Sequence, residues 1–462
     1  MFSSFKEKYI GDKAFYRRYL KIAIPMIIQQ GITSFVSFLD NIMVGQLGTE
    51  QMSGVAIVNQ LVFVFYLALF GVSAAGGIFG AQFYGNSDYR GQMHCFRFKL
   101  YAMILVTIAV IALFLKQGAF LISLYLNDSS SSGDLDLALS YALEYIVVIV
   151  VGFIPFAICQ AYAATIKETD QTFIPMLAGA VSVGVNAVLD YLLIFGIGPF
   201  PELGVTGAAL ATVIARFIEA IIVVVWAHRN IKQNAFLVGA YRGFGVPAEI
   251  LGKIMKKGTP LMINEVLWSL GQVAIMQAYS IKGLDVVAGL NISSTIFNLF
   301  NIVFIQLGGC ISIIVGQYLG SGDLEKAKDA DNKMIFFSTA CCIVMAALMF
   351  VLGSAFPKLY NTSDEIKLLA TNLIRVTAVF MPLYSLTHCI YFTLRTGGKT
   401  FVTFLFDSFF TIVVVFPIAF FLSHFTAFGI IAVYALVQCT ELLKIAIGTP
   451  MVKSNVWLNK MV

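Results

Sequence analysis

Long apolar runs dominate the chain and are separated by short polar stretches. Runs of roughly 20 apolar residues, the length of helix that crosses ~30 Å of hydrocarbon, recur twelve times. The runs are continuous and do not alternate with polar residues, which favours helices over the strands of a barrel. We therefore predict transmembrane helices over 18–42, 55–83, 98–118, 138–165, 172–196, 204–227, 255–281, 286–318, 334–356, 368–394, 401–423 and 426–449.

Composition and charge fit a membrane protein. The chain is 59% hydrophobic and 12% charged, which lies far outside the range of soluble domains. Lys and Arg are concentrated at the N-terminus, in the even-numbered loops and at the C-terminus. The positive-inside rule then predicts a multi-pass protein of the plasma membrane with both termini in the cytoplasm. The net charge of +5 follows from this topology, so we expect no nucleic-acid partner beside the lipid bilayer.

The two halves of the chain repeat one pattern. A shift of 235 residues aligns Pro25 with Pro260, Gly48 with Gly283, and the Gln-x-x-Gly of Gln82 with that of Gln317. Because the repeated unit has six helices, both copies enter the membrane from the same side. We predict an all-α fold of two parallel six-helix bundles related by a pseudo-two-fold axis. The N-lobe spans 1–235 and the C-lobe 236–462, with 228–254 as a cytoplasmic linker and hinge.

Polar residues present in only one half are not required by the shared fold. Asp40, in the first helix, aligns with Ile275 at the offset of 235. Asn186 and Asp190 lie four residues apart in the fifth helix, on one face. At the offset of 228 that relates the later helices, they align with Val414 and Ile418. These three polar residues therefore point to a function of the N-lobe.

Asp40 and Asp190 are predicted to lie at one depth of the membrane. Both helices run outward, and at 1.5 Å per residue each acid is roughly 27 to 33 Å along its helix. Membrane-embedded acids usually face water-filled cavities and mark ion pathways. Two acids held together in a poorly solvated pocket favour a proton or a small hard cation, because burial and like charge both disfavour the anions. These oxygens suit Na⁺. The ion would be bound by Asp40, Asn186 and Asp190, together with hydroxyls such as those of Thr33 or Thr206. The alternative is that both acids are solvated helix ends.

A second polar group is expected to line a substrate cavity. Asn264 and Glu265 lie about 15 Å along the seventh helix, and the first helix carries Gln29 and Gln30 at the equivalent positions. Glu265 and the abundant aromatic rings suit an organic cation. Each polar side chain is equally compatible with hydrogen bonding between helices. The predicted cavity residues are Gln29, Gln30, Asn59, Asn264, Glu265 and Asn291.

Other intramembrane charges are weaker signals. Arg216 with Glu219, and Arg375, are expected either to pair or to extend toward the membrane surface, and Asp407 is expected to pair with Arg395 or Lys399. The four His residues form no metal-ligand spacing, and no phosphate loop or familiar hydrolase motif is present. We therefore expect that the protein is not an enzyme and binds no cofactor. The energy for its activity must then come from an ion gradient.

Together these features resemble the multidrug and toxic compound extrusion (MATE) family. The resemblance rests on Pro25 with Asp40 and the following "VGQLG", on the two Gln-x-x-Gly motifs, on "NAVLDYLLIFG" in the fifth helix, and on twelve helices in two parallel lobes. It implies a cation-coupled antiporter with an N-lobe ion site at Asp40, Asn186 and Asp190. Thr206 corresponds to a further ligand, with Thr212 as a rival. The tenth helix has no Asp or Glu, so a C-lobe sodium site is not expected.

The expected function is efflux of organic cations or drugs by a monomer, in exchange for H⁺ or Na⁺. The two lobes rock to give alternating access, and Pro25 permits the first helix to kink. The alternatives are a lipid-linked oligosaccharide flippase of the same fold, an intramembrane enzyme and a scaffold that does not transport. The flippase needs several Arg or Lys in its cavity, and the enzyme needs a nucleophile or metal cluster.

Overall fold

Long helices form the fold throughout the described residues. The computed structural model describes residues 2–125, 134–243, 245–360 and 362–462, and every regular element in these ranges is a helix. The α-helices are α1 Phe2–Tyr9, α2 Lys13–Gly45, α3 Thr49–Gly85, α4 Tyr89–Ser123, α5 Leu135–Ile149, α6 Phe153–Lys167, α7 Phe173–Phe195, α8 Gly204–Arg229, α9 Ala248–Ser280, α10 Leu284–Ser321, α11 Leu324–Leu352, α12 Asp364–Thr396, α13 Thr400–Phe404, α14 Phe416–Phe425, α15 Ile430–Gln438 and α16 Thr440–Lys453. Short 3-10 or π-helical segments are η1 Val150–Gly152, η2 Ala235–Leu237, η3 Phe356–Leu359, η4 Leu405–Phe409 and η5 Thr411–Val415.

The helices fit the predicted membrane spans. Within the described residues, ten helices are long and apolar enough to cross a membrane. They coincide with ten of the twelve predictions, and three of them combine segments: η1 joins α5 to α6, η4 and η5 join α13 to α14, and α15 is followed directly by α16. The helices α2 and α9, of 33 residues each, occupy the remaining two positions. Several begin earlier than predicted, because a helix continues into polar sequence beyond the hydrocarbon.

The backbone confirms the internal repeat. The helices α2 and α9 have equal length, each contains a proline, and their first residues, Lys13 and Ala248, are 235 positions apart. The turns that follow contain Gly48 and Gly283, with φ of +147° and +125°. Glycine adopts this left-handed region without the steric cost of a Cβ. One turn therefore connects the first two helices of each half.

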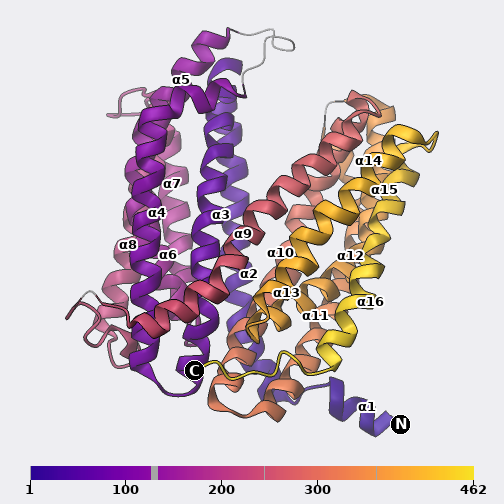
Figure 1. Cartoon of the computed structure of the whole chain (residues 1–462). Coiled ribbons are helices and arrows are strands. Elements are labelled where there is room, and N and C mark those ends of the chain that lie inside the picture. The colour runs from indigo at the N-terminus through magenta and orange to yellow at the C-terminus, as the bar shows by residue number, and fades with distance from the viewer. Residues whose placement is uncertain (1, 126–133, 244, 361) are drawn as a thin grey trace. The chain divides into compact units, whose positions relative to one another are not determined.

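The chain forms two compact units that are not contiguous in sequence. Unit 1 comprises Met1–Ala23, Ile78–Asp88 and Gly252–Val462, and unit 2 comprises Ile24–Gly77 and Tyr89–Leu251. The predicted lobe division at residue 235 stays a prediction. In unit 2, α6 packs against α4 and α8, and α7 packs against α8 (Figure 1). In unit 1, α12 packs against α10, α11, α15 and α16.

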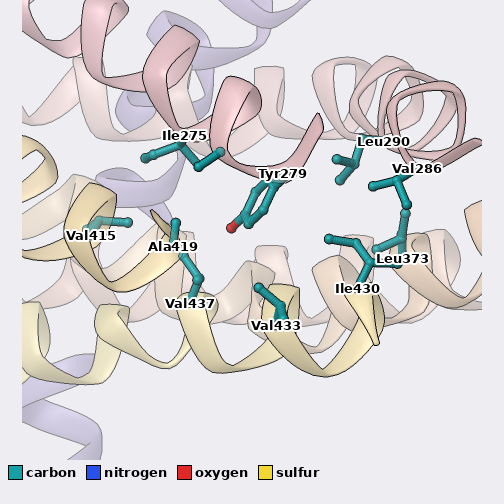
Figure 2. Close-up of a cluster of buried hydrophobic side chains, with 11 residues drawn as sticks. Ile275, Tyr279, Val286, Leu290, Leu373, Val415, Ala419, Ile430, Val433 and Val437 are labelled. Atoms are coloured by element: carbon teal, nitrogen blue, oxygen red, sulfur yellow. The ribbon is translucent and has the colours of Figure 1, made fainter. Parts of the chain in front are cut away.

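One hydrophobic cluster of unit 1 bears on the site. Side chains from α9, α10, α12, η5, α14 and α15 meet in it (Figure 2). Ile275 is 8% exposed, and Ile418 packs against the cluster as a partly buried residue. These are the residues that the repeat aligns with Asp40 and Asp190. Both aligned positions in the second half thus contribute apolar side chains to one hydrophobic region.

The linker region packs against unit 2. Arg97 on α4 donates hydrogen bonds of 2.8 Å to the carbonyls of Gly239 and Ala240, and one of 3.0 Å to that of Gly245. Phe236 in η2 is fully buried against Phe96. The predicted hinge at 228–254 is therefore anchored over part of its length, since its carbonyls and an aromatic side chain bind one surface.

Candidate functional site

Two acids from distant parts of the sequence meet in unit 2. Asp40 on α2 and Asp190 on α7 lie within hydrogen-bonding reach of each other, and Asp190 is 1% exposed. Among the described residues, no donor makes a well-formed hydrogen bond to Asp40 Oδ1 or to either carboxyl oxygen of Asp190, although the Asn186 side chain lies close to Asp190. Two carboxylates only accept hydrogen bonds. A hydrogen bond between them therefore requires one shared proton, and a small cation satisfies the same oxygens.

Asn186 and a threonine complete one side of this pair. Asn186 is 7% exposed, and its side chain lies next to the Asp190 carboxyl, one turn along α7. Its Nδ2 donates to Thr212 Oγ1 at 3.4 Å. Thr206, the predicted further ligand, instead donates to Glu144. The structure thus places Thr212, the rival position, beside Asn186.

A positive charge lies near the acid pair. Arg216 on α8 pairs with Glu219 at 3.1 Å and donates to Tyr66 OH at 3.4 Å. Its guanidinium lies over the Phe156 ring, 4.5 Å from the centroid, and attracts Asp40 electrostatically. The expected pairing of Arg216 with Glu219 is confirmed. Because Glu219 and the ring already hold Arg216, its charge only partly offsets the two acids.

The donor set suits a proton or a monovalent cation. No group of three or more His, Cys, Asp or Glu side chains in the described ranges could hold a metal ion. The carboxyls of Asp40 and Asp190, the Asn186 side chain and the Thr212 hydroxyl supply only oxygen ligands and one amide. Oxygen ligands are typical of hard cations. The site can therefore bind H⁺ or Na⁺ without any covalent chemistry.

The predicted cavity residues lie in both units. In unit 2, Gln29 lies beside Gly179, and the side chains of Gln30 and Asn59 are exposed. In unit 1, Asn291 is exposed and Glu265 is half-buried, accepting a hydrogen bond from Tyr391 at 3.4 Å. The cavity itself stays a prediction.

Asn264 belongs to a buried charged cluster that was not predicted. Asn264 is 1% exposed and donates to Asp407 Oδ2 at 3.0 Å. Asp407 pairs with Lys444 at 3.7 Å, and Lys444 also pairs with Glu441 at 3.7 Å. The expected pairing of Asp407 with Arg395 or Lys399 is wrong, because the π-helical segment η4 and the packing of α16 bring Lys444 to it. In the sequence, the feature that could have indicated this cluster is Lys444, a lysine within a largely apolar helix.

A second unpredicted ion pair is buried in unit 2. Lys99 on α4 and Glu168, just after α6, lie 2.7 Å apart with side chains 0% and 7% exposed. Burial raises the pKa of Glu168 to about 7, although the nearby Lys99 ammonium opposes this rise. Lys99 lies at the start of the helix predicted over 98–118 and Glu168 in the loop before the helix predicted over 172–196, and neither position indicated that the side chain is buried.

Known proteins are similar to this chain in sequence and in fold over most of its length. The family model described as MatE matches residues 25–192 and 260–421. The probable multidrug resistance protein NorM of Thermotoga maritima is 23% identical over 382 residues, which cover 82% of this chain and 80% of that protein. The multidrug export protein MepA of Staphylococcus haemolyticus is 24% identical, over 80% of this chain and 78% of its own. A structure described as the outward-facing conformation of a multidrug resistance MATE family transporter matches with a TM-score of 0.83 at 19% identity, covering 96% of this chain and 97% of that one.

Proposed function

This chain belongs to the MatE family of multidrug efflux transporters, and we propose that it expels organic cations in exchange for H⁺ or Na⁺ bound between Asp40 and Asp190. The relatives are named for multidrug resistance and export. Transport by an antiporter requires a group that binds the coupling ion in one state and releases it in another. The acid pair of unit 2 is the group proposed for this role.

One observation carries the proposal. The two positions that hold the acids Asp40 and Asp190 in one half hold Ile275 and Ile418 in the other, and both isoleucines belong to one hydrophobic cluster or pack against it. The apolar pair shows that packing does not require the acids. Carboxyl oxygens without a donor are costly when buried, so the acid pair is expected to be retained because it binds a cation.

The proposed cycle couples this binding to movement of α2. A cation that neutralises the pair removes the repulsion between α2 and α7, so α2 repacks. The division between the two units falls between Ala23 and Ile24, two residues before Pro25. Pro25 lacks a backbone donor and permits a kink there. Rocking of the lobes then alternates access of the substrate to the two faces of the membrane.

The basic residues of the chain do not favour the alternative function, that of a lipid-linked oligosaccharide flippase. Recognition of a pyrophosphate needs several basic side chains that are available to it. Arg216 is paired with Glu219, and Arg375 lies over the Phe350 ring, 5.4 Å from the centroid. An organic cation is a better match for the acids and aromatic rings of the chain.

Proteoliposomes test the proposal. Ethidium efflux is measured with a proton gradient and a sodium gradient imposed separately, for the wild type, Asp40→Asn and the exposed-acid control Asp136→Asn. For a one-to-one exchange, a tenfold ion gradient of about 1.4 kcal/mol supports at most a roughly tenfold dye gradient. We expect one of the two ions to drive efflux in the wild type and in the control, and neither to drive it in Asp40→Asn. Undiminished efflux by Asp40→Asn would overturn the ion site.

A further inference from the structure

Every carboxylate oxygen of one acid pair in unit 1 faces a hydrogen-bond donor or an ammonium group of the chain. Asp407 Oδ1 faces Lys444 Nζ at 3.7 Å, and Asp407 Oδ2 accepts from Asn264. Glu441 Oε1 faces the same Nζ at 3.7 Å, and Glu441 Oε2 accepts from Thr387 at 2.9 Å. In unit 2, three oxygens of the Asp40 and Asp190 pair have no donor among the described residues. The acid pair of unit 1 therefore has a counter-cation supplied by the protein, and the acid pair of unit 2 has none from the described residues between its carboxyls.

The position of Lys444 is that of a bound cation. Its ammonium group lies between carboxylates from two separate segments, η4 and α16, and it is 8% exposed. It also lies over the Phe410 ring, 5.6 Å from the centroid, which adds a cation–π attraction. A lysine ammonium is a compact point charge with three donors, so it replaces a small monovalent ion between the carboxylates.

The repeat shows that this charge pair is not needed for packing. Asp407 aligns with Gly179 at the offset of 228, and Lys444 aligns with Ile222 at the offset of 222 that relates the last helices of the two halves. Gln29, the equivalent of Asn264, lies beside Gly179 as Asn264 lies beside Asp407. The contact equivalent to that of Asn264 with Asp407 thus forms in unit 2 without the carboxylate.

Other titratable groups face the cluster and set its charge. His388 on α12 faces both Asp407 and Glu441. Glu265 on α9 lies near Arg395 of α12, whose guanidinium lies over the Tyr391 ring. Arg395 thus offsets Glu265, while Lys444 offsets Asp407 and Glu441. Removal of Lys444 leaves those two acids near His388, and Asp407 also near the acidic Glu265.

We propose that Lys444 is a built-in counter-cation that occupies a cation site between Asp407 and Glu441, and that it confines the coupling ion to unit 2. This inference rests on the proposed function, because it assigns the number of coupling sites. It also makes the site latent: a residue without charge at position 444 exposes a site for H⁺ or Na⁺.

Binding of Na⁺ to purified protein tests the latent site. The background is Asp40→Asn with Asp190→Asn, in which the site of unit 2 is removed. Equilibrium binding of radioactive Na⁺ at alkaline pH is then compared with and without Lys444→Met, and proton uptake is followed by titration between alkaline and acidic pH. We expect Lys444→Met to add about one saturable Na⁺ site, or about one proton taken up, per molecule. The two measurements distinguish the two ions.

Three variants make the outcome decisive. Lys444→Arg keeps the charge, so it must add no site. Asp407→Asn on top of Lys444→Met removes one carboxylate, so it must abolish the new site. Lys444→Gln, which keeps an amide donor, serves as the second test if Lys444→Met does not purify. Neither Na⁺ binding nor proton uptake in these neutral variants would overturn the proposal, whereas efflux by Asp40→Asn bears only on the site of unit 2.

Discussion

Substitution of Asp190 by Asn should make the protein more stable when no cation is present. Two unit charges at ~4 Å repel by about 4 kcal/mol at an effective dielectric constant of ~20, and the carboxyls of Asp40 and Asp190 lie within hydrogen-bonding reach. The Asn amide donates to Asp40 Oδ1, which no described residue does in the wild type. The variant therefore mimics the cation-bound state, and about 4 kcal/mol is the upper limit of its advantage.

The effect should depend on the buffer. In sodium-free buffer at a pH high enough to ionise both wild-type carboxyls, Asp190→Asn should unfold at a higher temperature than the wild type. Acidic pH, or Na⁺ if it is the coupling ion, neutralises the wild-type pair and should remove the difference. Asp136→Asn, which changes an exposed acid of the same unit, should unfold like the wild type in every buffer.

A thiol-reactive dye is a suitable probe of unfolding. Cys95, Cys159, Cys310 and Cys389 are buried, so they react only when the protein unfolds. Because unfolding of membrane proteins in detergent is often irreversible, all samples are heated at one rate. If Asp190→Asn and the wild type unfold at the same temperature in alkaline, sodium-free buffer, the two carboxyls do not repel and the proposed site is wrong.

Two further predictions concern the ends of the helices. The pKa of Glu168 is raised from 4.5 to about 7, so its contribution to stability is complete below pH 4.5 and is lost as the pH rises through about 7. Thermal scans should show a loss of roughly 3 kcal/mol across this range, whereas Glu168→Gln, which cannot ionise at this position, should show no such slope. Gly85→Ala should destabilise the protein, because a Cβ at Gly85 clashes with the Gln317 carbonyl, whereas Gly184→Ala, which meets no atom within 4 Å, should leave the unfolding temperature unchanged. Equal unfolding temperatures for the two Ala variants would contradict this interpretation of the Gln-x-x-Gly motif.

The sequence predicts which helices exist and which acids are exceptional. Hydropathy marks the membrane-embedded part of a helix but not its polar continuation, so α4 begins at Tyr89 rather than at 98. The repeat singles out Asp40 and Asp190, because equivalent positions can be compared. The rotation of each helix depends on side-chain packing, so spacing alone does not show that these two carboxyls face each other.

The pairing of Asp407 illustrates a second limit. Spacing suggests the nearest basic residues, Arg395 and Lys399, but Asp407 lies in the π-helical segment η4. A π-helix holds more residues per turn than an α-helix, so it redirects the side chains that follow. Asp407 consequently reaches Lys444, on a helix that begins 33 residues later in the chain. A local departure from α-helical geometry cannot be inferred from apolar periodicity.

The two halves show why duplication separates folding from function. The isoleucines at these positions, of which Ile275 is buried and Ile418 partly buried, stabilise their half, since a side chain that leaves water fully contributes about 1.5 to 3 kcal/mol. The acid pair at the same positions costs free energy until a cation arrives. Lys444 shows that a covalently attached cation removes this cost, but such a cation can never be released. The pair of Asp40 and Asp190 retains the cost, and a site that must bind and release an ion in each cycle requires this.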